Sequence, residues 1–301
     1  MNYLYLLLAL VLAPVLPGVV NQTKAFFAGR RGPGLFRLYF DLAKLMRKSC
    51  PRSSTSTWVF DLAPAVSLAV TVAAAALFPW TLDATAPCAA VGVVPFFYLL
   101  GTGRFFTVLG ALDTGSAFAG MGASREVEFS ALVEPIVFVV LGFLVLLTGE
   151  TSFALLSGCA AGSWLAHPVP LVLAGLAFFA ILLSENCRVP FDDPETHLEL
   201  TMIHEAMILD NAGPDLAYIL YGAALKFTVL AAFFVALLLP RLGAAAAPVR
   251  GLILLAGVLA TGVLVGVVES IMARMRFLKT PQVLLGAFMI ALLAILLFVL
   301  F

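Results

Sequence analysis

The chain has 301 residues, of which 62% are hydrophobic and only 11% are charged, and its formal net charge is zero. Soluble domains carry about 25% charged residues, so this composition excludes a water-soluble globular protein. A mean hydropathy of +1.09 agrees with that exclusion. A net charge of zero gives no electrostatic reason to expect a nucleic-acid partner.

Apolar runs of about 20 residues are typical of transmembrane helices. The alternating pattern of a β-barrel is absent, so the spans should be helical. The sequence therefore predicts an all-α, polytopic membrane protein with one integral membrane domain over residues 1–301. In chain order, the eight predicted spans are residues 2–20, 58–80, 88–112, 127–148, 168–186, 217–239, 249–272 and 282–301.

The basic residues predict the orientation of these spans. The first loop, residues 21–57, is rich in Lys and Arg, whereas the second and fourth loops have none. Cytoplasmic loops carry the excess of basic residues, so the odd-numbered loops should be cytoplasmic. With eight spans, both termini then lie on the outer face of the cytoplasmic (inner) membrane.

Two of the cytoplasmic loops have patterns of their own. In Gly34–Lys48 of the first loop, Leu35, Leu38 and Leu42 share one face and the basic residues share another. This pattern predicts an amphipathic helix at the lipid interface. The alternative is that the helix is a plain surface anchor with no other role. The fifth loop, residues 185–216, is acidic, and its apolar spacing predicts a helix that begins after Pro194.

The acidic loop holds an unusual concentration of charge. Eight of the seventeen carboxylates lie between Glu185 and Asp215, where Arg188 is the only Lys or Arg. On a solvent-exposed helix, Glu195 and Glu199 at i and i+4 would be mildly destabilising and otherwise inert. Packed against protein, such neighbours would raise each other's pKa and could exchange protons, and His197 and His204 titrate in the same range.

Ionisable residues also lie in or beside the spans. Such residues are expensive in hydrocarbon and often mark ion routes, so Glu134, Glu269 and Asp113, with Arg125, are candidates for an intramembrane proton path. The alternative is a structural role, in which Glu134 pairs with Arg125, Glu269 pairs with Arg274, and Asp113 is an ordinary interfacial residue.

The cysteines do not indicate a metal site. Cys50, Cys88, Cys159 and Cys187 show no CxxC or CxH spacing, which favours small buried residues. His204 and Glu205 are adjacent and do not form an HExxH motif. We therefore expect neither a metal nor a cofactor in this chain.

The segment Glu185–Leu200 resembles the acidic signature of the complex I subunit that forms the quinone chamber, known as subunit 1 or H. The likeness extends to Arg31-Gly32-Pro33 before the amphipathic helix, to the eight spans and to the acidic fifth loop. The matching residues are Glu185, Asn186, Arg188, Pro190, Phe191, Asp192, Pro194, Glu195, Glu199 and Leu200.

One departure is informative, because His197 replaces the family's middle glutamate. The continuation through residue 215 resembles the membrane subunits of group 4 [NiFe]-hydrogenases, of the formate hydrogenlyase and hydrogenase-4 type. That resemblance implies hydrogenase-like large and small subunits, an Fe–S subunit and antiporter-like membrane subunits as partners. It also implies that the [NiFe] centre and the Fe–S clusters lie in those partners, so this chain would be the non-redox membrane subunit of an oxidoreductase.

The resemblance assigns proton coupling, or the interface with the redox arm, to the acidic loop. The residues concerned are Glu185, Arg188, Asp192, Asp193, Glu195, His197, Glu199, His204, Glu205 and Asp210. Two other functions stay open: a quinone-chamber subunit of a respiratory NADH:quinone oxidoreductase, and a passive membrane anchor. An independent transporter is a weaker alternative, because we find no inverted repeat. The electron donor of such a complex could be formate, ferredoxin or carbon monoxide.

Overall fold

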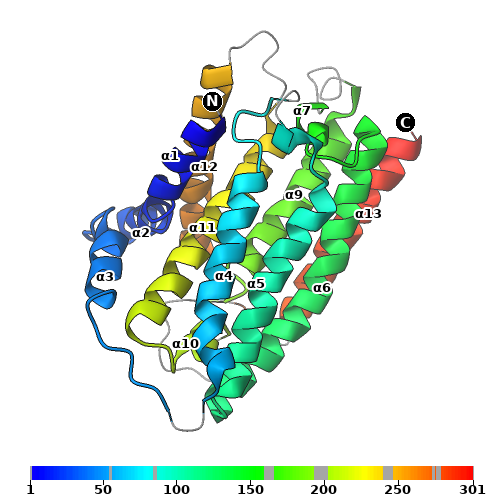
Figure 1. The fold of residues 1–301 in the computed structure, drawn as a ribbon. Coiled ribbons are helices and arrows are strands. Elements are labelled where there is room, and N and C mark those ends of the chain that lie inside the picture. Colours follow the sequence, from blue (N-terminus) through cyan, green and yellow to red (C-terminus); the bar gives the residue numbers. More distant parts are fainter. Residues whose placement is uncertain are drawn as a thin grey trace.

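The fold is a bundle of long helices (Figure 1), seen in a computed structural model. Residues 2–53, 56–83, 87–158, 166–192, 203–239, 247–272, 275 and 279–300 are described. Within these ranges there is no strand beyond one isolated bridge, between Gly92 and Ser152. The predicted all-α, polytopic membrane fold is confirmed.

Seven described helices are long and apolar enough to cross a membrane, and counting one bent pair as a single span gives up to eight crossings. The seven are α4 (Trp58–Leu77), α5 (Val93–Asp113), α6 (Ala117–Thr148), α9 (Pro168–Glu185), α11 (Gly213–Leu238), α12 (Ala247–Ile271) and α13 (Thr280–Leu300). Shorter elements are η1 (Pro87–Ala90), α7 (Ala154–Gly158) and α10 (His204–Ile208).

The first predicted span is not one straight helix. Helices α1 (Asn2–Leu12) and α2 (Val15–Phe27) meet at an angle of 49°. Pro14 cannot donate to the carbonyl of Leu10, which instead accepts a hydrogen bond of 3.0 Å from the Tyr221 hydroxyl. The Val11 carbonyl likewise accepts a hydrogen bond from the Tyr39 hydroxyl. Proline explains the bend, and the two tyrosines satisfy the carbonyls that it frees.

Helix α6 is much longer than its predicted span of 127–148, because it begins at Ala117. Its first turns contain charges and glycines that the hydropathy pattern assigned to a loop. The helix ends at Gly149, whose φ of 74° is the left-handed conformation that glycine adopts without strain. Arg125 and Glu126 therefore lie on a spanning helix, not in a loop.

Helix α11 forms the centre of the bundle and is its most buried spanning helix. It packs against α4, α9 and α12. Phe233 of α11 stacks on Phe178 of α9, with ring centroids 4.9 Å apart, and meets Phe96 of α5 at 6.3 Å. Residues on α11 are thus close to most of the bundle.

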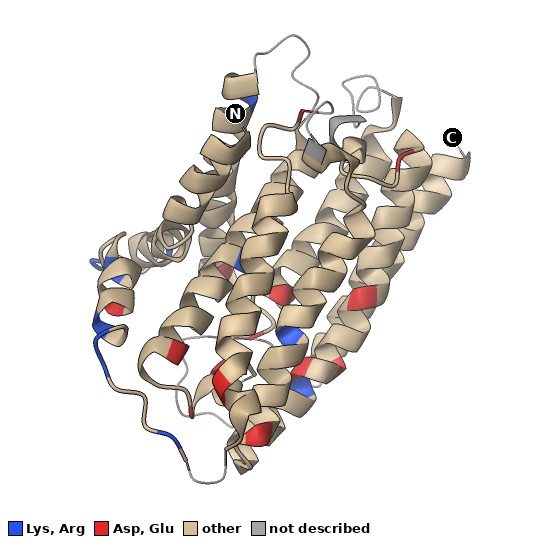
Figure 2. Ribbon diagram, in the orientation of Figure 1, with Lys and Arg blue, Asp and Glu red and all other residues tan. Residues whose placement is uncertain are grey.

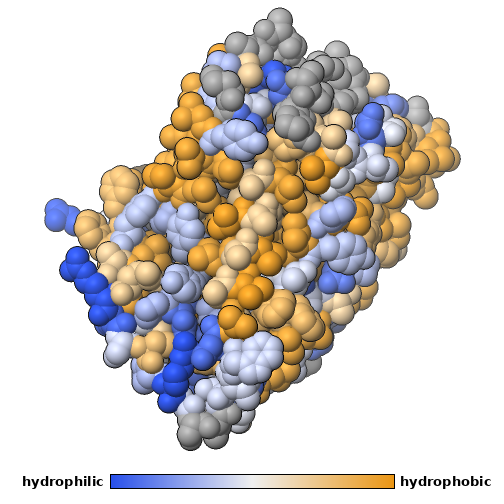
Figure 3. All heavy atoms as spheres, viewed as in Figure 1, coloured by the Kyte–Doolittle hydropathy of each residue, from blue (hydrophilic) through white to orange (hydrophobic). Residues whose placement is uncertain are grey.

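The predicted interfacial helix is α3 (Arg37–Leu45), which is shorter than the predicted 34–48. It has no buried residue, and Asp41 forms ion pairs with Arg37 and Lys44 on its polar face. Phe36, just before the helix, and Phe40, within it, are exposed. Figure 3 shows hydrophilic groups at this side of the molecule, next to the apolar surface of the long helices.

Charge is distributed unevenly along the bundle. Most of the Lys, Arg, Asp and Glu residues lie toward the end that carries α10 (Figure 2). Both ends of the chain lie at the opposite end of the bundle (Figure 1), as an even number of crossings requires. Which end faces the cytoplasm stays a prediction from the basic loops.

Candidate functional site

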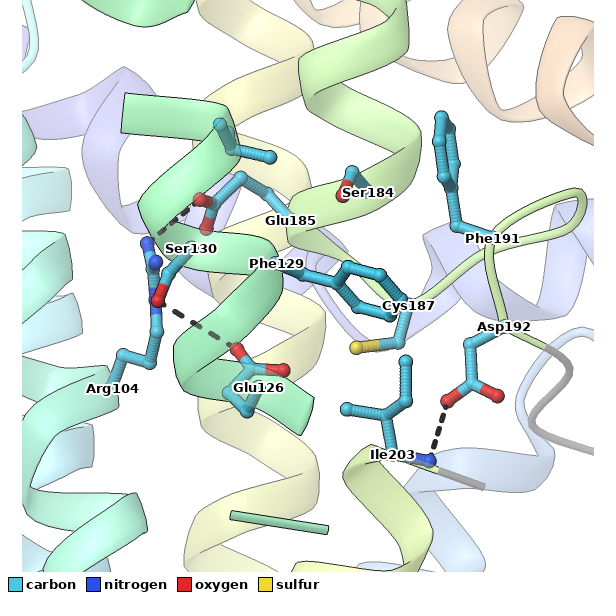
Figure 4. Close-up of a pocket in the computed structure, with 11 residues that line it drawn as sticks. Arg104, Glu126, Phe129, Ser130, Ser184, Glu185, Cys187, Phe191, Asp192 and Ile203 are labelled. Atoms are coloured by element: carbon cyan, nitrogen blue, oxygen red, sulfur yellow. Dashed lines mark hydrogen bonds and ion pairs between the residues drawn. The ribbon is translucent and has the colours of Figure 1, made fainter. Parts of the chain in front are cut away.

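An arginine held between two carboxylates lies inside the bundle, near the α10 end (Figure 4). Arg104 of α5 forms a salt bridge of 2.7 Å with Glu185, the last residue of α9. Its Nε atom is 3.7 Å from a carboxylate oxygen of Glu126 on α6. The three side chains are 10–14% exposed, so these charges interact with little screening from solvent.

Lys226 of α11 completes this group. Its Nζ atom is 2.7 Å from the second carboxylate oxygen of Glu185 and 2.8 Å from the Glu185 backbone carbonyl. The lysine therefore neutralises charge and also satisfies a carbonyl at the C-terminus of α9, where helices leave such groups unpaired. We call Arg104, Glu126, Glu185 and Lys226 the Glu185 cluster.

A second group of charges surrounds Glu269 of α12, whose side chain is 0% exposed. Glu269 pairs with Lys24 of α2 at 3.2 Å and with Arg188 at 3.6 Å. The Arg188 guanidinium also lies over the Phe227 ring, 5.2 Å from its centroid. We call Lys24, Arg188 and Glu269 the Glu269 cluster. A charge this buried requires such partners.

These pairings bear on the partner that the sequence suggested for Glu269. The salt bridge that the structure gives Arg188 is to α12, and the Glu185 carboxylate is held by α5 and α11. Glu269 has partners other than the proposed Arg274, which lies outside the described residues. Hydropathy and loop position could not reveal these contacts, because each joins segments that are distant in sequence.

A central cavity of about 220 Å³ lies between the two clusters. Charged side chains of both clusters line it, and so do apolar residues that include Pro17, Leu38 and Met207. Lys226 and Phe227, which are consecutive on α11, contact one cluster each. The cavity therefore has a polar wall that reaches from α5 to the segment after α9.

Asp192 is 2% exposed and lines the same cavity. Its carboxylate accepts a hydrogen bond of 3.2 Å from the backbone N–H of Ile203, just before α10. This bond holds together the two described ends of the acidic loop. The side chains that line the cavity include three cations and four carboxylates, namely Arg104, Arg188 and Lys226 with Glu126, Glu185, Asp192 and Glu205.

His204, the first residue of α10, also lines the cavity. Its Nε2 atom is buried and has no hydrogen-bond partner within the part of the chain that the structure describes. Burial, together with the positive charge of Lys226, lowers the pKa of His204 to about 4. Burial likewise raises the pKa of the Cys187 thiol well above its usual value, so this cysteine stays a neutral thiol.

Other predicted residues lie outside the clusters. Asp113 accepts hydrogen bonds from the backbone N–H and hydroxyl of Thr57, at 2.7 and 2.8 Å, and from the Phe60 N–H at 3.3 Å. It therefore holds the start of α4. Asp210 is exposed, and Glu205 lines the central cavity.

Glu134 is exposed on α6, within the span, where it lines a small pocket of about 50 Å³ with Arg104 and Glu185. Arg125 lies further toward the N-terminus of the same helix. Asp193, Glu195, His197 and Glu199 lie outside the described residues, and the structure does not test the roles predicted for them.

Several site residues were not predicted. Lys24, Glu126 and Lys226 drew no attention in the sequence, although a lysine inside an apolar run is itself a signal. A third group of charges also went unnoticed, in which Arg52 pairs with Asp61 at 2.8 Å and with Asp215 at 2.7 Å. Among the described residues, no three His, Cys, Asp or Glu side chains could hold a metal ion together.

The fold and the site define a polytopic membrane protein with a network of buried, paired charges at one end of its bundle. More particularly, the chain belongs to the NADH dehydrogenase family, which it matches over residues 1–300. The family resemblance of the acidic segment is thereby confirmed.

Two curated relatives are similar over nearly their whole length. The chain is 34% identical to hydrogenase-4 component C of Escherichia coli (strain K12), covering 95% of this chain and 91% of the relative. It is 33% identical to formate hydrogenlyase subunit 4 of the same organism, covering 98% of each. NADH-ubiquinone oxidoreductase chain 1 of Triticum aestivum is more distant, with 25% identity over 73% of this chain and 68% of the relative.

A solved structure has the same fold. A chain of the membrane-bound sulfane sulfur reductase, an archaeal respiratory membrane complex, superposes with a TM-score of 0.83. The match covers 98% of this chain and 99% of that chain, at 17% sequence identity. The fold thus occurs in multisubunit membrane oxidoreductases.

Proposed function

We propose that this chain is the membrane subunit of a hydrogen-evolving, complex I-like oxidoreductase. It docks a soluble redox arm at the α10 end and couples electron transfer there to proton or ion translocation. The [NiFe] centre and the Fe–S clusters belong to the hydrogenase-like subunits of that arm, and antiporter-like subunits carry the ions. The similarity to hydrogenase-4 component C and formate hydrogenlyase subunit 4 supports this assignment.

The observation that supports the coupling role is the pairing of the end of α9, and of the segment after it, with other spanning helices. Glu185 is held by Arg104 and Lys226, and Arg188 is held by Glu269. A change of charge or position at the acidic loop therefore alters the electrostatic interactions of charged side chains on α5, α11 and α12. In a low-dielectric interior such a change alters the proton affinity of every neighbour.

The direction of the chain in the cytoplasmic membrane follows from the same proposal. The redox arm is cytoplasmic, so the α10 end faces the cytoplasm and both termini face outward. The excess of Lys and Arg in the first loop supports this orientation.

The test is a charge-neutral substitution in the assembled complex. Glu126→Gln keeps size and hydrogen-bonding ability but removes a titratable group that lies 3.7 Å from Arg104. In membrane vesicles, hydrogen evolution should continue while proton translocation per hydrogen falls several-fold. Glu150→Gln is the matched control, because Glu150 is exposed at the opposite end of the bundle. Normal proton translocation in both the Glu126→Gln and the Glu269→Gln complexes would reject the coupling role and support the passive membrane anchor instead.

The central cavity favours a second candidate, the quinone-chamber subunit of a respiratory complex. Its lining combines apolar residues, which include Pro17, Leu38 and Met207, with charged side chains, and this mixture suits an amphiphilic ligand. Quinone that co-purifies with the complex, or inhibition by quinone-site compounds, would support this candidate. A nickel–iron large subunit among the co-purifying proteins would support the hydrogenase.

A further inference from the structure

The first loop and the end of α2 place positive charge on the surface that the described residues do not neutralise. Residues 24–48 include seven basic residues and a single acidic one, Asp41. Lys24 pairs with Glu269, and two others pair with Asp41. The remaining four are exposed and form no ion pair with another residue that the structure describes, namely Arg30, Arg31, Arg47 and Lys48.

Helix α3 presents different residues to the bundle and to the surface. Leu38 lines the central cavity, and the Tyr39 hydroxyl donates a hydrogen bond to the Val11 carbonyl. Phe36 and Phe40 are 58% and 66% exposed, and they share one face because they are four residues apart. Exposed aromatic rings beside cations are typical of protein surfaces at the level of the lipid headgroups. The aromatic and basic side of α3 is therefore the side left open to such an environment.

The end of α2 continues this surface. Helices α2 and α3 are in contact, and the Gln22 side chain donates a hydrogen bond of 2.6 Å to the Pro33 carbonyl between them. Arg30 and Arg31 lie just beyond the end of the bent pair of helices α1 and α2. Basic residues gather along α3 and the segment after it (Figure 2), next to the apolar surface of the long helices (Figure 3). We call Arg30, Arg31, Phe36, Phe40, Arg47 and Lys48 the first-loop patch.

We propose that the first-loop patch binds anionic phospholipid headgroups in the leaflet nearest to α10. Its four cations attract the negative headgroups, and Phe36 and Phe40 insert among the first carbons of the acyl chains. The occupant is lipid and not an acidic protein, because the patch adjoins the apolar surface that lipid covers. The inference goes beyond the proposed function, since it concerns the lipids that the subunit retains, and no patch residue belongs to the Glu185 cluster or the Glu269 cluster.

The test places a fluorescent reporter in the patch. Phe40→Trp puts an indole at an exposed position, and its emission is measured in the assembled complex as the difference from the wild-type complex. The complex is reconstituted into vesicles that contain equal amounts of phosphatidylcholine and phosphatidylglycerol, with bromine on the acyl chains of one lipid or of the other. Bromine quenches indole fluorescence only at short range, so the two vesicle preparations report which lipid lies beside the patch.

We expect brominated phosphatidylglycerol to quench the indole more strongly, with an association constant relative to phosphatidylcholine of about five at low salt. The double substitution Arg47→Gln and Lys48→Gln should lower this ratio towards one, and so should high salt, which screens the attraction. Lys279→Gln is the matched control and should leave the ratio unchanged, because Lys279 is also exposed but lies outside the patch, at the start of α13. Phe36→Trp is the second reporter if the Phe40→Trp complex does not assemble.

Three results would overturn the inference. Equal quenching by the two brominated lipids would show a surface anchor that does not select headgroups. No quenching by either lipid would show that a protein partner covers the patch. An unchanged preference for phosphatidylglycerol after the Arg47→Gln and Lys48→Gln substitutions would show that these cations do not attract the lipid. Each of these results leaves the proposed function intact, because that function is tested by proton translocation in variants of the two buried clusters.

Discussion

At the scale of single residues, Arg188 shows how the buried charges depend on one another. Among the described residues, it is one of two cations that pair with the fully buried Glu269, and its guanidinium also covers the Phe227 ring. Removing one partner of a buried pair typically costs about 3–5 kcal/mol, because the remaining charge stays buried.

We therefore predict that Arg188→Ala lowers the yield of assembled complex by at least five-fold. Arg188→Lys, which keeps the charge but loses the planar group over Phe227, should give an intermediate yield. Native gel electrophoresis of solubilised membranes measures both, and Arg37→Ala is the control, because Arg37 is largely exposed on α3. Wild-type assembly in Arg188→Ala would contradict the role given to this ion pair.

His204 gives a prediction about acid stability. Its pKa is about 4 in the folded chain, below its ordinary value of 6.5. The unfolded chain therefore binds more protons between these values, so stability should fall as the pH drops from 6.5 towards 4, by up to about 3 kcal/mol. Thermal unfolding of the complex should show this loss, and His204→Gln should reduce its pH dependence. An identical pH profile in the variant would disprove the assignment.

The sequence identified only part of this site. Glu185, Arg188 and Asp192 were predicted because their segment matches a family signature and departs from the low charge of the rest of the chain. Their partners Lys24, Arg104 and Lys226 could not be assigned, because the contacts form between helices whose neighbours hydropathy does not specify. The hydrogen bond from the Ile203 backbone N–H to the Asp192 carboxylate could not be predicted from the sequence either.

At the scale of elements, the short helix α10 depends on one glycine of α6. A Cβ atom on Gly122 would lie 2.8 Å from the Ile203 carbonyl oxygen and 3.0 Å from the Ala206 Cβ atom. Both neighbours are held by the fold, so they cannot easily yield. The close approach brings the first residue of α10, His204, against the cavity.

We predict that Gly122→Ala destabilises the chain by about 1–3 kcal/mol, because the two helices must move apart. Gly120→Ala is the matched control on the same helix, where the added Cβ meets nothing within 4 Å. It should be neutral or stabilising by up to about 1 kcal/mol, since alanine favours the helix. Thermal unfolding in detergent compares them, and equal midpoints would show that α10 does not need this contact.

Element boundaries were predictable where composition changes sharply and not elsewhere. The spans at α9, α12 and α13 were placed within about two residues, because proline or polar residues flank them. The charged first turns of α6 hid ten helical residues, and one proline divided the expected first span into α1 and α2. A polar residue can lie in a loop, or it can lie on a spanning helix and pair with a buried charge, and the sequence does not distinguish these two cases.

At the scale of the whole molecule, the segregation of charge to one end predicts how the chain lies in the membrane. Asp210 and Glu150 are both exposed, and they lie near opposite ends of the bundle. In a background without other cysteines, Asp210→Cys should react with a membrane-impermeant thiol reagent only from the cytoplasmic side. Glu150→Cys should react only from the outer side. Labelling of both from one side would refute the arrangement of crossings.

The all-α membrane architecture followed from composition, but the packing of helices did not. Helix α2 lies against α12, where a Cβ on Gly262 would be 2.7 Å from the Leu16 side chain. Nothing in either apolar run indicates that these two helices, from opposite ends of the chain, are neighbours. Small residues allow the two helices to approach closely, and the ion pair between Lys24 and Glu269 is a further contact between them.

That ion pair has a consequence for the order in which the protein is made. Ribosomes deliver α2 to the bilayer early and α12 near the end of synthesis, so Lys24 reaches the membrane interface long before its carboxylate exists. An unpaired charge near a spanning helix is expensive, which keeps the N-terminal helices at the interface until α12 arrives. Enclosure of the central cavity is then among the last events of biogenesis. A nascent chain halted before α12 would expose its polar interior to lipid and to quality-control proteases.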